Sequence, residues 1–171
     1  VEYDGQKVSP ICKTIVIMLN KPKKVITTVK DTHNRKTVMD FIPNKFRLTP
    51  IGRLDQNTTG LLLFTNDGDL HQFLTHPKNK IPKDYEAIIE GRITLSQKQK
   101  IKKGIYIGFK EYGQAEVLEQ STQKTRSKVI LRLRQGKKRE IRRIFYKLNV
   151  KLIGLKRISF SQIKLGALEE G

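Results

Sequence analysis

Residues 59–65 (TGLLLFT) form a continuous apolar run between a Gly/Asn/Thr-rich loop and the turn sequence NDGD. An apolar run of this length with turn residues at both ends predicts a strand in the core of the protein. Any fold of this chain must therefore cover residues 59–65 completely, and the polar loop before them must lie where this core strand begins.

The rest of the chain predicts strands that come in pairs, interrupted by short helices. Further strands are expected over 14–19, 24–29, 83–91, 113–120, 126–134 and 151–159. Helices are expected over 36–42, 69–75, 95–103 and 138–148, the third starting at Thr94 and ending at Gly104. Paired strands favour an α+β fold with an antiparallel or mixed sheet over a doubly wound parallel sheet.

The charge of the chain points to a polyanionic partner. It has 35 Lys and Arg against 16 Asp and Glu, a formal net charge of +19. A lysine-rich background explains part of this excess, and nucleic acid is the commonest partner for the remainder. No apolar run could cross a bilayer and no signal peptide is visible, so no membrane role is expected. A single cysteine, Cys12, excludes an intramolecular disulfide and suits a reducing compartment.

Asp55 is the first candidate for chemistry, because it lies in the polar loop directly before the core strand. A carboxylate there is held by a rigid element yet can be reached from outside. The alternative is an Asx turn that only binds loop N–H groups. Calcium is excluded, because an EF-hand loop starting at Asp55 would have Asn66 where a bidentate Glu is required.

Two further segments carry candidate residues. Tyr85, at the head of a predicted strand, can stack on a base, although tyrosine in a strand is more often a core residue. In the stretch 135–146 (QGKKREIRRIFY), most of which belongs to the helix predicted over 138–148, Arg142 flanks the apolar face and can hold a carboxylate in a bidentate fork. On the same helix we expect a solvated basic face that includes Lys137, Lys138 and Arg143.

Other catalytic patterns are missing from the sequence. The three histidines are scattered, there is no zinc spacing, and there is neither a Walker loop nor a dinucleotide fingerprint. We therefore expect neither a metal nor an organic cofactor.

Taken together, these segments resemble bacterial ribosomal RNA pseudouridine synthases of the RsuA/RluB/RluE/RluF type. GRLDQNTTGLLLFTNDG is similar to the catalytic motif of that family, KDYEAIIEG to its second motif and QGKKREIRRIF to its third. IMLNKPKKVITTVKD and GLKRISFSQIKLGALEEG resemble its opening and closing segments, so the similarity runs from about Val16 to Gly171. Two residues depart from the family pattern: Lys24 replaces a usual Gly, and Glu140 replaces a usual Gln and adds an acid beside Arg139.

The resemblance implies the pseudouridine synthase fold, a mixed and mostly antiparallel sheet split by a basic catalytic cleft and flanked by helices. It implies that a uridine of ribosomal RNA flips out and is isomerised to pseudouridine without a cofactor. It also implies Asp55 as the catalytic residue, Tyr85 stacked on the target base and Arg142 paired with Asp55. RNA contacts are expected at Arg53, Lys21, Lys83, Lys138 and Arg139. The alternative is a non-catalytic RNA-binding or ribosome-assembly protein on the same fold.

Residues 1–12 resemble the tail of a small S4-like RNA-binding domain, or a linker, and residues 13–171 then form the catalytic domain. We expect a monomer that acts on ribosomal RNA in the bacterial cytoplasm or in an organelle of bacterial descent.

Overall fold

The centre of the fold is β5 (Thr59–Thr65), in which all seven residues are buried. A computed structural model describes residues 2–4, 6–7, 13–43 and 46–171. In it, β5 pairs antiparallel with β3 (Val16–Lys21) on one edge and parallel with β11 (Leu152–Phe160) on the other. The prediction of a core strand at 59–65 is therefore confirmed.

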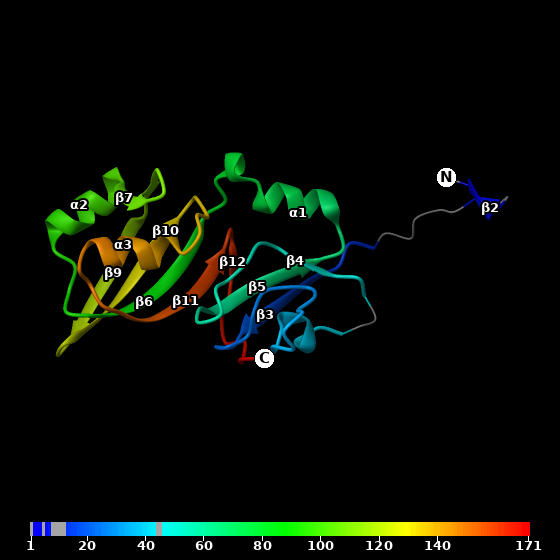
Figure 1. Ribbon diagram of the computed structural model, residues 1–171, viewed down its shortest axis with the longest axis horizontal. Coiled ribbons are helices and arrows are strands. Elements are labelled where there is room, and N and C mark those ends of the chain that lie inside the picture. Colours follow the sequence, from blue (N-terminus) through cyan, green and yellow to red (C-terminus); the bar gives the residue numbers. More distant parts are fainter. Residues whose placement is uncertain (1, 5, 8–12, 44–45) are drawn as a thin grey trace.

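These strands belong to an eight-stranded mixed sheet with the order β3-β5-β11-β6-β10-β9, to which β4 and β12 add short edges. The pairing of β5 with β11 is the only parallel one between strands in the described part of the chain. The expected α+β fold with a mixed, mostly antiparallel sheet is confirmed (Figure 1). The remaining strands of this sheet are β4 (Thr49–Pro50), β6 (Lys83–Glu90), β9 (Glu116–Gln123), β10 (Arg126–Leu133) and β12 (Ile163–Lys164).

Capping side chains mark the start of the first two α-helices. In α2 (Leu95–Lys103), Thr94 caps the first turn and Gly104 ends the helix with a φ of 110°, as predicted. Asp67 caps α1 (Gly68–Thr75), where its side chain accepts a hydrogen bond from Leu70 N. The other helices are η1 (Val38–Phe41), η2 (Pro77–Asn79) and α3 (Glu140–Lys147).

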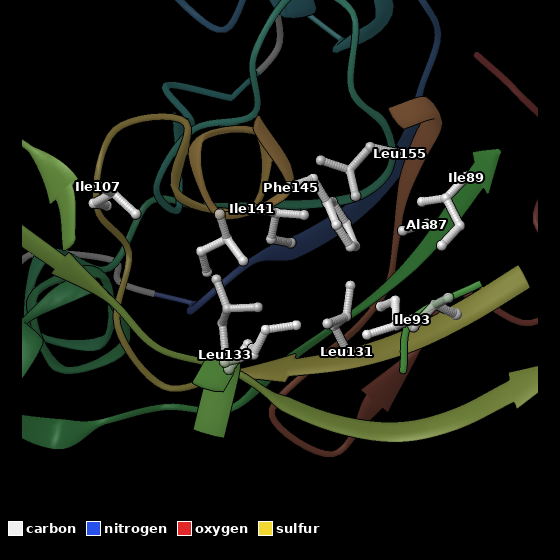
Figure 2. Packing of buried hydrophobic residues seen from close by; sticks show 13 residues of the cluster. Ala87, Ile89, Ile93, Ile107, Leu131, Leu133, Ile141, Phe145 and Leu155 are labelled. Atoms are coloured by element: carbon white, nitrogen blue, oxygen red, sulfur yellow. The ribbon is translucent and has the colours of Figure 1, made fainter. Parts of the chain in front are cut away.

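The two ends of the sheet have separate hydrophobic cores. The first core lies between α3 and the strands β6, β10 and β11, with Phe145 at 0% exposure in its middle (Figure 2). The second core lies between β3, β5 and residues 25–54. Tyr85, which is half-buried on β6, packs against both cores, so its side chain marks the junction between the two halves of the sheet.

One strand prediction was wrong, and one hairpin was missed. Residues 24–29 form no strand and make a single isolated bridge, Ile26 to Thr37. Lys24 N and Thr27 Oγ1 donate instead to Gln56 O and Leu54 O in the loop around Asp55. The hairpin of β7 (Ile105–Gly108) and β8 (Glu111–Gly113) was missed. Its turn residues Phe109 and Lys110 have φ of 53° and 58°, a conformation that usually requires Asn or Gly and is therefore not signalled by Phe-Lys.

The N-terminal boundary stays a prediction, because most of residues 1–12 lie outside the described residues. The described part of that segment contains β1 (Glu2–Tyr3) paired with β2 (Gln6–Lys7). None of the helices in the described ranges combines the length and the apolar character that a bilayer crossing requires.

Candidate active site

Hydrogen bonds from Thr27 and Thr58 fix the backbone of the loop that carries Asp55. Thr27 Oγ1 donates to Leu54 O at 2.9 Å and accepts from Leu54 N at 3.2 Å. Thr58 N donates to Asp55 O at 2.9 Å and closes the turn before β5. The Asp55 side chain keeps 32% of its surface exposed. A rigid backbone thus presents a carboxylate that solvent or a substrate can reach.

Lys21 lies beneath this loop, and the expectation that it contacts RNA is wrong for this structure. Its side chain is 0% exposed, and Nζ donates to the carbonyls of Pro22 at 2.8 Å, Val25 at 2.7 Å and Gln56 at 3.3 Å. An ammonium group has three protons, so these three bonds use all of them. Burial lowers the pKa of Lys21 to about 8, against the opposing charges of Asp55 and Glu170.

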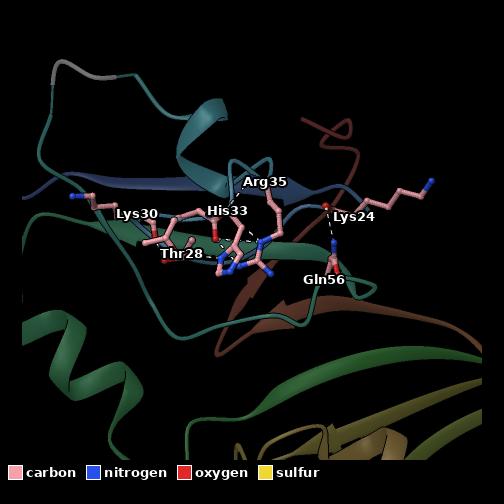
Figure 3. Close-up of polar contacts among 8 residues, drawn as sticks. Lys24, Thr28, Lys30, His33, Arg35 and Gln56 are labelled. Atoms are coloured by element: carbon pink, nitrogen blue, oxygen red, sulfur yellow. Dashed lines mark hydrogen bonds and ion pairs between the residues drawn. The ribbon is translucent and has the colours of Figure 1, made fainter.

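The turn at Lys24, where the resembled family usually has glycine, keeps a glycine-like backbone with a φ of 64°. Lys24 N donates to Gln56 O at 2.9 Å, and the Gln56 amide reaches back to Lys24 O at 3.4 Å. Figure 3 shows the Lys24 side chain extending away from these bonds. In the next loop, Arg35 Nη2 donates to Asp31 Oδ1 at 2.6 Å. Lysine at position 24 therefore preserves the turn and adds an outward charge.

Arg142 on α3 reaches the Asp55 loop, but not as the expected fork on the carboxylate. Its Nε lies 3.4 Å from Asp55 Oδ2, while Nη2 donates to Asn57 O at 2.9 Å and to Thr58 Oγ1 at 3.1 Å. Burial lowers the pKa of Arg142, the charge of Asp55 raises it and Arg139 lowers it. One guanidinium therefore binds both the carboxylate and the backbone of the loop that carries it.

Of the three residues expected to form a solvated basic face, only Lys138, which precedes α3, is exposed. Arg143 donates to Ile107 O at 3.0 Å and Gly108 O at 2.7 Å and pairs with Glu111 at 2.6 Å. Lys137 donates to Tyr112 O. Both side chains hold the β7–β8 hairpin, which the sequence analysis had missed, so their partners could not be foreseen.

Glu140, the second departure from the family pattern, points into the fold. It is 3% exposed and its carboxylate accepts from Gln114 N at 3.0 Å and Lys137 N at 3.1 Å. Burial raises the pKa of Glu140, against the lowering effect of these two bonds. Its carboxylate joins α3 to the segment after β8, so this acid does not simply reduce the surface charge beside Arg139, as we had expected.

A cleft of about 820 Å³ brings together most of the candidate residues. Asp55, Tyr85, Arg142, Arg53, Lys83 and Arg139 line it, whereas Lys21 and Lys138 do not. Its lining is strongly basic, with acids at Asp55, Glu116 and Glu140 against Lys and Arg at 53, 80, 83, 102, 132, 134, 137, 139, 142 and 157. Such an excess in a concave site attracts a polyanion.

Three arginines of the cleft, Arg132, Arg134 and Arg157, were not singled out from the sequence. Arg132 binds Asp84 in a fork, with both nitrogen–oxygen distances 2.8 Å. This pairing lowers the pKa of Asp84. Arg157 is only 2% exposed, although it lies at the cleft. Each lies in an alternating pattern that predicts a strand and nothing more, and only the folded sheet brings these arginines to the cleft. Among the described residues, no three His, Cys, Asp or Glu side chains are grouped as metal ligands.

Comparisons with known proteins identify the family. The sequence model described as RNA pseudouridylate synthase matches residues 15–147. The chain belongs to the RNA pseudouridine synthase family. Ribosomal large subunit pseudouridine synthase B of Bacillus subtilis is 36% identical over 174 residues, which cover 100% of this chain and 71% of that protein. An uncharacterized RNA pseudouridine synthase of Aquifex aeolicus is 35% identical, over 100% of this chain and 69% of its own length.

Solved structures agree with this membership. A crystal structure of a pseudouridylate synthase matches with a TM-score of 0.82 and 27% identity, over 95% of this chain and 70% of the other. Human RNA pseudouridylate synthase domain containing 1 matches with a TM-score of 0.59 at 15% identity, which shows a shared fold alone. This pseudouridine synthase therefore has the fold that the resemblance implied, and the resemblance to the RsuA/RluB/RluE group is confirmed.

Proposed function

We propose that this pseudouridine synthase isomerises a uridine of ribosomal RNA, with Asp55 as the catalytic carboxylate. The observation that carries the proposal is the Asp55–Arg142 pair, 3.4 Å apart, at a basic cleft that Tyr85 also lines. The names of relatives such as ribosomal large subunit pseudouridine synthase B support ribosomal RNA as the substrate. We propose that the protein acts as a monomer in the bacterial cytoplasm or in an organelle of bacterial descent.

The reaction needs a base that has left the helix. A cleft of about 820 Å³ lies within the range of about 300–1,000 Å³ typical of small-ligand sites, so one flipped nucleotide fits. In this proposal the half-buried Tyr85 ring, which lines the cleft, stacks on the uracil. Arg53, at the rim beside Asp55, helps to hold the flipped conformation, while Lys83, Lys138 and Arg139 attract the RNA backbone.

The isomerisation breaks the bond between uracil N1 and ribose C1′ and forms a bond between C5 and C1′. The proton on C5 is lost to water and N1 gains one, so neither oxidation nor hydrolysis occurs. Asp55 acts by attacking the sugar or the base, or by assisting the loss of a sugar proton. Arg142 holds the carboxylate and its loop, and Tyr85 keeps the detached base in place while it turns.

The decisive experiment uses ribosomal RNA from a strain that lacks this gene. A pseudouridine-specific reagent followed by reverse transcription should show one lost stop, which returns with a wild-type copy of the gene. Unchanged stops would favour the alternative, a non-catalytic RNA-binding or ribosome-assembly protein on this fold. In that case a pull-down of ribosomal RNA with the protein would identify the alternative, since such a protein binds RNA without changing any stop.

A further inference from the structure

Arg157 on β11 is buried without an anionic partner. Its side chain is 2% exposed, and Nε donates to Leu61 O at 2.7 Å. Nη2 is buried and has no hydrogen-bond partner, and no acid of the described residues forms an ion pair with this guanidinium. A buried cation without a partner is costly, so its position calls for a ligand that supplies the missing charge.

The register of the sheet places Arg157 beside the proposed catalytic residues. Arg157 is the cross-strand partner of Tyr85, so both side chains lie on the same face of the sheet and both line the cleft. Lys83 precedes Tyr85 by two residues on β6 and therefore shares that face. Arg157 Cζ and Lys83 Nζ lie 5.1 and 5.2 Å from the centre of the Phe160 ring, so the two cations meet at one ring.

Lys83 is also short of anionic partners. Nζ makes one hydrogen bond, to Ile81 O at 2.9 Å. Burial first, and then the charge of Arg157, lower the pKa of Lys83 to about 8, while Glu140 acts in the opposite direction. The Glu140 carboxylate is already engaged by two backbone N–H groups. The two cations therefore repel each other, and neither forms an ion pair with a carboxylate of the described residues.

We propose that Arg157 and Lys83 form a phosphate-binding site at the floor of the cleft, which holds the phosphodiester next to the uridine stacked on Tyr85. This proposal rests on the proposed function. A neutral uracil carbonyl would need one neutral donor, whereas two cations with spare donors suit an anion with several acceptor oxygens. Nη2 is buried in the free protein, so the side chains around it must move before the phosphate reaches it.

Such a site has a clear use in this reaction. When the base leaves C1′ and turns, the sugar must stay in place for the new bond to form. A phosphate bound beside Tyr85 fixes the ribose through its own backbone, so only the base moves. Arg157 and Lys83 are therefore positioning residues, distinct from the pair at Asp55.

The test measures binding of three small probes by calorimetry: uridine, uridine 3′-monophosphate and uridine 5′-monophosphate. The wild-type protein should bind one of the two nucleotides about tenfold or more tightly than uridine, a difference of about 1.4 kcal/mol. Arg157→Met and Lys83→Met should each remove that preference and leave uridine binding within about twofold. Lys128→Met, an exposed lysine on β10 outside the cleft, is the charge-matched control and should keep it.

Equal binding of uridine and both nucleotides by the wild type would overturn the proposal, and so would an equal loss in the Lys128→Met control. If Arg157→Met does not fold, the wild-type and Lys83→Met titrations still decide, because Lys83 is only half-buried. No turnover is involved. A phosphate preference in a protein that leaves ribosomal RNA unmodified would therefore contradict the proposed function but not this site.

Discussion

Nε of Arg142 lies 3.4 Å from Oδ2 of Asp55, and Nη2 of the same guanidinium binds the loop two and three residues further on. Arg142 comes from α3, which packs on the first core, whereas Asp55 precedes β5, next to the second core. The contact therefore joins the two halves of the protein at the point where the proposed chemistry takes place.

Replacing Arg142 with Ala should reduce pseudouridine formation much more than stability. The substitution removes a cation next to Asp55 and two hydrogen bonds to its loop. Breaking a fully buried ion pair costs about 3–5 kcal/mol of interaction free energy, and the 32% exposure of Asp55 reduces that cost. We expect a rate loss on the order of 100-fold, a barrier increase of about 2.7 kcal/mol. Tritium release from RNA labelled at uridine carbon 5 measures it.

Arg142→Lys should recover only part of this activity, because an ammonium cannot serve the carboxylate and the loop together. Lys147→Ala, an exposed residue on the same helix, is the control and should remain fully active. A fully active Arg142→Ala variant would show that this arginine serves only the surface or the RNA backbone.

Lys21 should make the protein more stable as the pH rises from about 8 to 10.5. Its pKa is lowered from 10.5 to about 8 by burial, so over that interval the unfolded chain binds more protons than the folded one. The free energy of unfolding then increases with pH, by at most about 3 kcal/mol from this group. Urea unfolding at a series of pH values, compared between the wild type and Lys21→Met, isolates the contribution.

The Lys21→Met variant should lose this slope, although it is less stable overall because three carbonyls lose their donor. Lys128→Met, exposed on β10, should keep the wild-type slope. Identical slopes in the wild type and in Lys21→Met would mean that Lys21 stays protonated throughout the range.

Gly60 should tolerate no side chain. Its φ is 100°, and a Cβ there would lie 2.2 Å from Arg157 O on the neighbouring strand. Gly60→Ala would force β5 and β11 apart beside the Asp55 loop, and we expect a loss of about 4 kcal/mol or more in urea unfolding. Gly68→Ala, where a Cβ meets nothing within 4 Å, should change stability by less than about 1 kcal/mol. Similar stability of the two variants would contradict the close approach of β5 and β11.

Local signals explain what the sequence could predict. The cap at Thr94 and the end at Gly104 are decided within a few residues, so α2 was predicted with its observed bounds. The strand at 59–65 followed from its composition. The pairing of Asp55 with Arg142 came from the family resemblance, because 87 positions separate the two residues and no local pattern connects them.

The errors have the opposite cause, since they depend on contacts between distant segments. Lys21 looked like a surface cation, but the loop around Asp55 closes over it. Arg143 looked solvated because the hairpin it binds turns at Phe109-Lys110, without the usual turn residues. Arg157 attracted no attention, because nothing in its neighbourhood in the sequence indicates that β6 and β11 would place it beside Tyr85.

The most direct test of the account is the activity of Asp55→Asn. Asparagine keeps the size of the side chain but cannot act as an anionic nucleophile or base. We predict that tritium release falls to background while RNA affinity stays within about twofold of the wild type, since the basic lining of the cleft is unchanged. Activity of Asp55→Asn close to that of the wild type would contradict the central claim that Asp55 is the catalytic carboxylate.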